Sequence, residues 1–87
     1  MADEPTAEEI AQHFSAMDDS VTLINATVAD DTEAKEIYGS AAEVKLMVTR
    51  NTDHLELQAT HSWYSDSSKT KTPYTNAITA GKAYVAG

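Results

Sequence analysis

The chain has no cysteine, only three glycines and two prolines, and no lysine or arginine before Lys35. The absence of cysteine excludes disulfide bonds and thiolate metal sites. The 87 residues form one small domain, which buries about 60 to 65 % of the surface exposed by its unfolded chain. A domain with so thin a core gains stability from regular helix packing or from association with another protein.

Long apolar runs are also missing, which limits where the protein is expected to act. No stretch approaches the roughly 20 apolar residues that span a bilayer. The first ten residues, MADEPTAEEI, lack the basic and apolar regions of a secretory signal. We therefore expect a protein that has no membrane contact and is cytoplasmic as made, with residues 1–5 as a flexible N-terminus.

Negative charge is abundant and unevenly placed. The formal net charge is -8, and residues 1–34 contain nine acids and no lysine or arginine. Such a surface repels phosphate backbones, and no basic stripe with interleaved aromatics is present, so nucleic acid is not an expected partner. The acidic third is interpreted either as a solvated helix face or as the contact face of an acidic inhibitor that binds a basic partner.

The first third of the chain has a strong helix signal. Thr6 and Glu9 have the spacing of a capping box, in which each side chain accepts a hydrogen bond from the backbone of the other residue. Apolar residues then recur at steps of three and four, as at the a and d positions of a coiled coil. They are Ile10, Phe14, Met17, Val21, Ile24 and Val28. The pattern predicts a helix over residues 6–29 that packs along its length against another helix.

The stretch from Glu43 to Trp63 fits two interpretations. Apolar and polar residues alternate from Leu55 to Trp63, which suits an α+β fold with a hairpin at 44–63. A seam with steps of three and four also crosses the stretch without a change of phase, which favours a helix over residues 32–60. The seam contains Ala34, Ile37, Ala41, Val44, Val48, Asn51 and Leu55. We expect the helix, because a hairpin would have to turn near Arg50 without glycine or proline.

The last third predicts a loop and a short helix. The run at 65–72 is polar and without pattern, and Thr72 followed by Pro73 predicts the start of a helix over residues 73–85. The expected fold is all-α, with residues 1–87 as one domain: an antiparallel two-helix hairpin with the C-terminal helix packed back on it. At 1.5 Å per residue the second helix, of about 45 Å, extends beyond the first, of about 35 Å. The overhang is predicted to carry Leu57, Trp63 and Tyr64.

Residues that could support chemistry are few. His13, His54 and His61 are the candidate ligands of an alternative function, a small metal- or ligand-binding domain. His54 and His61 are seven residues apart, which is about 10 Å along a helix and too far for both to chelate one ion. The adjacent carboxylates Asp18 and Asp19 point in different directions on a helix and do not form an acid and base pair. We expect no catalytic residues, no metal and no cofactor.

Two segments of the C-terminal half, NTDHLELQ at 51–58 and NAITAGKAY at 76–84, carry a family resemblance. They resemble segments of small uncharacterised proteins encoded by tailed bacteriophages, in which a helix is followed by a tryptophan-containing loop and a short closing helix. The resemblance includes no catalytic motif. It implies a virion-associated or assembly-accessory protein, and it supports a helix over residues 44–63.

The expected function follows from apolar residues that the helical hairpin cannot cover. Tyr38, Ala42, Leu46 and Leu57 lie away from the seam, so the third helix is expected to cover some of them and another subunit the rest. Exposed apolar patches of several hundred Å² are rare on stable monomers. We therefore expect a non-catalytic helical interaction module that holds a protein partner or further copies of itself. The candidate interface residues are Tyr38, Leu46, Leu57, Trp63 and Tyr64.

Overall fold

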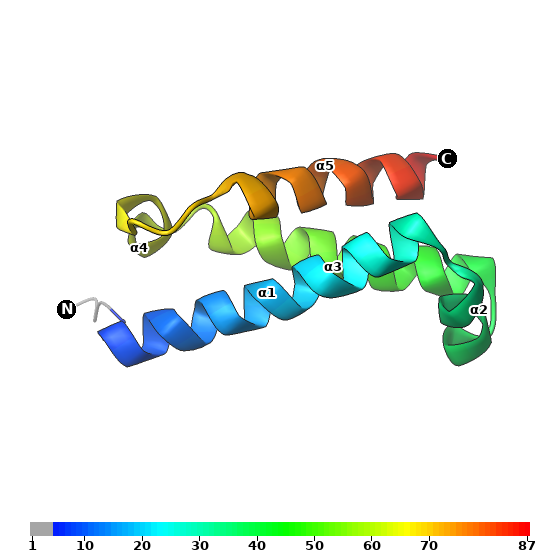
Figure 1. Cartoon of the computed structure of the whole chain (residues 1–87), viewed down its shortest axis with the longest axis horizontal. Helices are drawn as coiled ribbons and strands as arrows, with labels where there is room; N and C mark the ends of the chain where they lie inside the picture. The colour runs from blue at the N-terminus through cyan, green and yellow to red at the C-terminus, as the bar shows by residue number, and fades with distance from the viewer. Residues whose placement is uncertain (1–4) are drawn as a thin grey trace.

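The computed structural model describes residues 5–87 and contains five helices and no strand in this range (Figure 1). The helices are α1 (Ala7–Ala29), α2 (Thr32–Tyr38), α3 (Ala41–Gln58), α4 (Ser62–Asp66) and α5 (Thr72–Ala86). The predicted all-α class is confirmed, and no hairpin forms at 44–63. The flexible N-terminus predicted for residues 1–5 falls mostly on residues 1–4, which lie outside the described residues.

The three longer helices lie side by side along the long axis of the molecule. α1 and α5 run in one direction, α3 runs in the opposite direction, and each of the three packs on the other two (Figure 1). The principal extents are 44 × 21 × 17 Å. α2 lies at one end of this bundle and α4 at the other. The architecture is therefore a three-helix bundle in which α5 completes the core.

The start of α1 has the predicted capping box. The Thr6 N–H donates to Glu9 Oε1 at 2.8 Å, and the Glu9 N–H donates to Thr6 Oγ1 at 3.1 Å. These bonds satisfy two backbone N–H groups that have no partner within the helix. The helix begins one residue later, at Ala7, so the predicted boundary agrees with the structure to within one residue.

Most of the predicted seam of α1 faces the core. Phe14, Met17 and Ile24 are buried, and Ile10 and Val21 of the same seam are partly buried. Val28 is the exception, because it is exposed while Thr27 beside it is buried. Val28 lies in the last turn of α1, just before the chain turns towards α2, and there Thr27 faces the core in its place.

The predicted continuous helix over residues 32–60 is interrupted at Gly39 and Ser40. Gly39 has a φ of 95°, in the left-handed region that favours glycine, and it ends α2. Ser40 is extended, and its hydroxyl accepts a hydrogen bond from the Glu43 N–H at 3.2 Å, which starts α3. α3 has 18 residues, about 27 Å at 1.5 Å per residue. The prediction of a long overhang is therefore wrong.

α4 folds across the end of the bundle and closes it. The Phe14 ring lies 5.4 Å from the Trp63 ring and 5.9 Å from the Tyr64 ring, measured between centroids. Trp63 and Tyr64 thus pack on α1, where the prediction placed them on an overhang. The predicted loop at 65–72 is shortened by helix at both ends, since α4 ends at Asp66 and α5 begins at Thr72.

α5 fills the groove between α1 and α3. Tyr74, Ala77 and Gly81 are its buried residues, and Pro73 lies in its first turn as predicted. Thr72 is already helical, so it is not the N-cap. In this position α5 leaves Leu46 and Leu57 exposed. The prediction that the third helix would cover some of Tyr38, Ala42, Leu46 and Leu57 is therefore wrong, because all four are exposed.

The core has two clusters of buried apolar residues. The larger joins α1, α3, α4 and α5 and contains Phe14, Met17, Ile24, Leu55, Tyr64, Tyr74 and Ala77. The smaller contains Val44, Met47 and Val48, with Ala34, Tyr84 and Val85 packed against it. Within residues 5–87, no helix is long and apolar enough to cross a membrane.

Candidate functional site

The structure divides the five predicted interface residues into an exposed and a buried group. Leu57 is 63 % exposed, Leu46 is 41 % exposed and Tyr38 is 40 % exposed. Trp63 is half-buried and Tyr64 is buried. Tyr64 was therefore wrongly included among the surface residues, because α4 turns its ring into the core.

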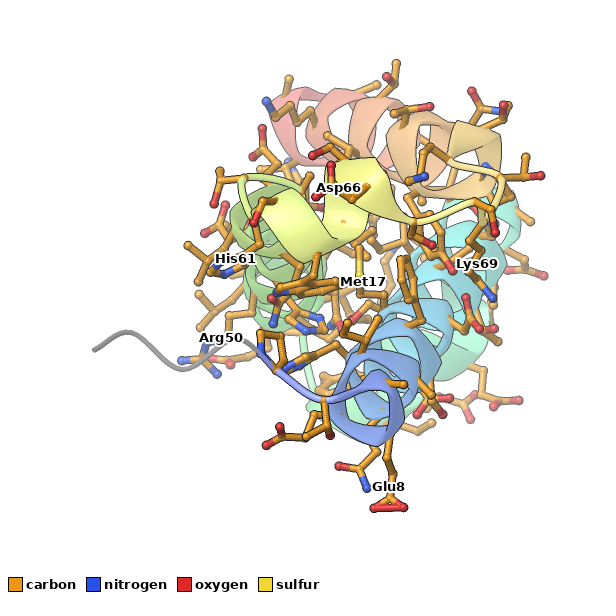
Figure 2. All side chains as sticks on the ribbon, turned by 90° about the vertical axis from the view of Figure 1, so that its left-hand side faces the viewer. Glu8, Met17, Arg50, His61, Asp66 and Lys69 are labelled. Atoms are coloured by element: carbon orange, nitrogen blue, oxygen red, sulfur yellow. The ribbon has the colours of Figure 1, made fainter. Side chains whose placement is uncertain are left out.

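The outer face of α3 is the exposed side of this helix, and one edge of it borders the groove between α3 and α5. We define it by Leu46, Arg50, Asp53 and Leu57, all of which are exposed. Their steps of four, three and four place them in one stripe of a helix, and the buried residues of α3 lie on the opposite side. Figure 2 shows Arg50 pointing out from the bundle, whereas Met17 lies at its centre.

The two charged residues of the outer face were missed by the sequence analysis as site residues. Arg50 and Asp53 have the spacing of an intrahelical ion pair, but within residues 5–87 neither makes one. A second stripe with steps of four, three and four was visible in the sequence beside the core seam. This stripe could have identified Arg50 and Asp53 as neighbours of Leu46 and Leu57 on one face of the helix.

Two histidines meet the tryptophan at the closed end of the bundle. The His13 ring stacks on the Trp63 ring at 4.9 Å with an interplanar angle of 16°, and the His61 ring stacks on it at 5.6 Å and 14°. His61 lies at the surface beside α4 (Figure 2). The stacking geometry is that of ordinary aromatic packing and holds the half-buried indole in place.

The third histidine lies in a different part of the molecule, between α1 and α3. Ser20 Oγ is 2.9 Å from Asn51 Oδ1 and 2.9 Å from His54 Nδ1. Asn51 Nδ2 donates to the Met47 carbonyl at 2.9 Å, so its oxygen faces Ser20. Ser20 therefore donates to Asn51, and His54 Nδ1 donates to Ser20.

This direction of hydrogen bonding is opposite to that of an activated serine. A nucleophilic serine donates its proton to the neighbouring base, whereas Ser20 donates to an amide and is buried. The three side chains instead satisfy one another's polar groups inside the helix interface. Asn51, which the sequence placed in the core seam, is thereby explained as a partner of Ser20.

Two tyrosines connect α5 to acidic residues of the first part of the chain. Tyr74 Oη donates to Asp18 Oδ1 at 2.6 Å, and Tyr84 Oη donates to Asp31 Oδ2 at 2.8 Å. Burial, together with these bonds, raises the pKa of both phenols above the usual value. The hydrogen bond from Tyr84 lowers the pKa of Asp31. Both phenols are thus held in the neutral form as donors.

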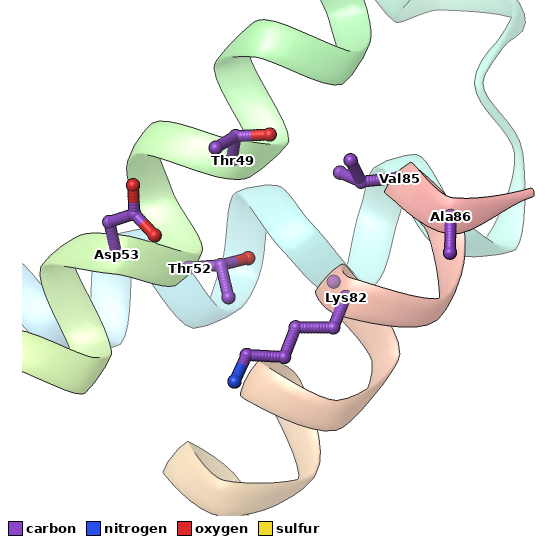
Figure 3. A pocket seen from close by; sticks show the side chains of 7 residues that line it. Thr49, Thr52, Asp53, Lys82, Val85 and Ala86 are labelled. Atoms are coloured by element: carbon purple, nitrogen blue, oxygen red, sulfur yellow. The ribbon is translucent and has the colours of Figure 1, made fainter.

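A small groove of about 200 Å³ lies between α3 and α5. Its lining includes Thr52, Gly81 and Val85, with Lys82 and Asp53 at its edge (Figure 3). A Cβ atom on residue 81 would collide with Thr52 Oγ1, so the buried hydroxyl packs against the backbone of α5. The groove is smaller than the 300 to 1,000 Å³ that is typical of ligand pockets.

The alternative based on three histidines has no geometric support in the described part of the chain. His54 is bonded to Ser20 while His13 and His61 stack on Trp63. Among residues 5–87 there is no group of three or more histidine, aspartate or glutamate side chains that could hold a metal ion.

No protein-family model, no curated protein and no solved structure matches the chain. The outer face of α3 carries two of the exposed large apolar side chains of the described chain, Leu46 and Leu57.

Proposed function

We propose that the protein is a non-catalytic helical association module that binds another protein chain through the outer face of α3. The observation that carries the proposal is the exposure of Leu57, at 63 %, beside that of Leu46, at 41 %, on one helix face. Full burial of a leucine side chain stabilises an association by about 1.5 to 3 kcal/mol. Two such residues on one face of a rigid helix are suited to anchor a partner.

α2, which packs against α3, carries a second exposed apolar area. α2 has no buried residue, and its Ile37 and Tyr38 are 67 % and 40 % exposed. They line a hollow together with Met47 and the end of α1. The short helix thus adds a separate apolar area at one end of the molecule (Figure 1).

The polar residues of the interior support a binding role over a catalytic one. Ser20, Asn51 and His54 satisfy one another, and the phenols of Tyr74 and Tyr84 donate to carboxylates. Their hydrogen bonds hold helices together and do not converge on a cavity. The resemblance of the C-terminal half to tailed-phage proteins suggests that the associated partner belongs to a phage particle or to its assembly.

The proposal is tested by photo-crosslinking in the cells in which the protein is made. A photoreactive amino acid replaces Leu46 or Leu57 and, as the matched control, Leu23, which lies on α1 and is 42 % exposed. We expect discrete protein adducts from positions 46 and 57 and much weaker ones from position 23. Equal or absent adducts at all three positions would refute an association role for the outer face.

A further inference from the structure

We infer that the outer face of α3 binds a second copy of this chain, with the two α3 helices antiparallel about a two-fold axis. In this arrangement Leu46 of one copy meets Leu57 of the other, and Arg50 of each copy meets Asp53 of its partner copy. The inference rests on the proposed function, because it assumes that this face is an association surface, and it adds the identity of the occupant.

The order of residues along the face carries the argument. Leu46 lies four residues before Arg50 and Leu57 lies four residues after Asp53, so the stripe is symmetric about the point midway between the two charges. In an isologous two-fold contact each residue meets a different residue of the same patch. An antiparallel helix therefore places leucine opposite leucine and arginine opposite aspartate.

The steps of four, three and four also suit the packing of two antiparallel helices. Such steps are the a and d positions of a coiled-coil seam, whose side chains interdigitate at a shallow crossing angle. Across an antiparallel pair each a position shares a layer with a d position of the other helix. The outer face thus supplies two mixed charge layers in the centre, with a leucine layer on each side of them.

The charges of the face are free to pair between copies. Within residues 5–87 the ion pairs are Lys35 with Asp31, Lys69 with Asp18 and Lys82 with Glu56. Arg50 and Asp53 are both exposed and take part in none of these. The face itself is neutral, which matters because two copies with a net charge of -8 each otherwise repel one another.

The same charges select the antiparallel arrangement. In a parallel two-fold pair each residue would meet its own copy, so that Arg50 would face Arg50 and Asp53 would face Asp53. Like charges opposed in this way disfavour that partner orientation. Two helix faces with two leucines each are smaller than a stable interface of about 1,200 Å² or more, so we expect a reversible dimer that forms as concentration rises.

Charge reversal tests the register in the full-length protein by sedimentation velocity over a concentration series. Arg50→Glu alone places acid opposite acid in its own dimer, and Asp53→Arg alone places base opposite base. We expect each variant to dimerise about tenfold more weakly than the natural protein or worse. An equimolar mixture of the two variants restores both opposite-charge pairs, and its association should return to within a few-fold of the natural level.

The controls separate this inference from misfolding and from the proposed function. Both substituted residues are exposed, so circular dichroism and melting temperature should match those of the natural protein. Leu57→Ser should weaken the dimer, whereas Leu23→Ser, at an exposed leucine of α1 outside the outer face of α3, should not.

Three outcomes overturn the inference: a natural protein that is monomeric at the highest concentration, single variants that dimerise normally, or a mixture that associates no better than its components. If the photo-crosslinks from positions 46 and 57 lead to a different protein instead, the association role stands and the second copy is excluded. Adducts of twice the 9.4 kDa chain support the second copy.

Discussion

At the scale of single residues, polar pairs between helices connect positions that are far apart in sequence. Tyr74 reaches Asp18 across 56 residues, and Ser20 reaches Asn51 and His54 on α3. Such bonds are worth about 0.5 to 1.5 kcal/mol each, but leaving one buried partner unpaired costs about 1 to 3 kcal/mol. These bonds therefore mainly determine which faces of the helices meet, and they add little to the net free energy of unfolding.

Tyr74 makes the stability of the protein sensitive to alkaline pH. Burial and the bond to Asp18 raise its pKa above the usual 10.0. The phenol thus keeps its proton in the folded state where the unfolded chain loses it, so its contribution is complete below pH 10 and is lost as the pH rises through the folded-state pKa. The free energy of unfolding should fall steeply above pH 10.

Tyr74→Phe tests this dependence. At pH 7 the loss of the Asp18 bond should lower the free energy of unfolding by about 1 kcal/mol, because Asp18 is itself half exposed. Above pH 10 the variant should lose less stability per pH unit than the natural protein. Urea unfolding at both pH values measures the difference, and Tyr38→Phe, at an exposed tyrosine, is the matched control. Identical slopes for the natural protein and Tyr74→Phe would contradict the assignment.

At the scale of helices, two glycines act in different ways. Gly39 ends α2 with a φ of 95°, a left-handed conformation that glycine adopts readily and other residues rarely adopt. Gly81 lies inside α5, where glycine weakens a helix, and its lack of a side chain lets α5 approach Thr52 on α3. The sequence pattern shows both glycines as helix-weakening residues. Only the packing of α3 against α5 shows that Gly81 permits a close approach, whereas Gly39 ends a helix.

Gly81→Ala should destabilise the bundle although alanine favours the helix. Alanine improves helix propensity by about 1 kcal/mol, but the added methyl group collides with the buried Thr52 hydroxyl, and overpacking of this kind costs about 1 to 3 kcal/mol. We expect a net loss of about 1 kcal/mol in urea unfolding. In the double variant with Thr52→Ala, the loss should shrink, since the colliding group is gone. A Gly81→Ala variant with a raised melting temperature would show that the contact is loose.

At the scale of the whole molecule, excess negative charge opposes the compact state. The net charge is -8, and the three ion pairs found within residues 5–87, at N–O distances of 3.4, 3.8 and 2.6 Å, join partly exposed side chains. Exposed pairs contribute about 0 to 1 kcal/mol each. Repulsion among the acids, most of them on the first part of the chain, should therefore outweigh the attraction of these pairs.

Added salt should accordingly stabilise the protein. Raising sodium chloride from a few millimolar to about 0.15 M shortens the Debye length to about 8 Å, which screens repulsion between acids. We expect the melting temperature to rise by a few degrees, with most of the increase below about 0.15 M. An uncharged solute of equal osmolality is the control, and a melting temperature that falls with salt would mean that ion pairs dominate.

The sequence was sufficient for the helical class, the ends of α1 and the start of α5, because these depend on local periodicity and on capping residues. It also identified Leu46, Leu57 and Tyr38 as apolar residues outside the seam, and all three are exposed. It did not show that Gly39 and Ser40 together divide one predicted helix into two, since either residue alone is compatible with a weakened continuous helix.

Only the packed structure decided which apolar residues are hidden. α4 turns Tyr64 inward, and α5 lies in the groove between α1 and α3, so the outer face of α3 is left without cover. A helix repeats its side chains every 3.6 residues whatever lies beside it, and the period is therefore readable from the chain. Which stripe becomes core depends on where the other helices pack, and that is settled by contacts between residues distant in sequence.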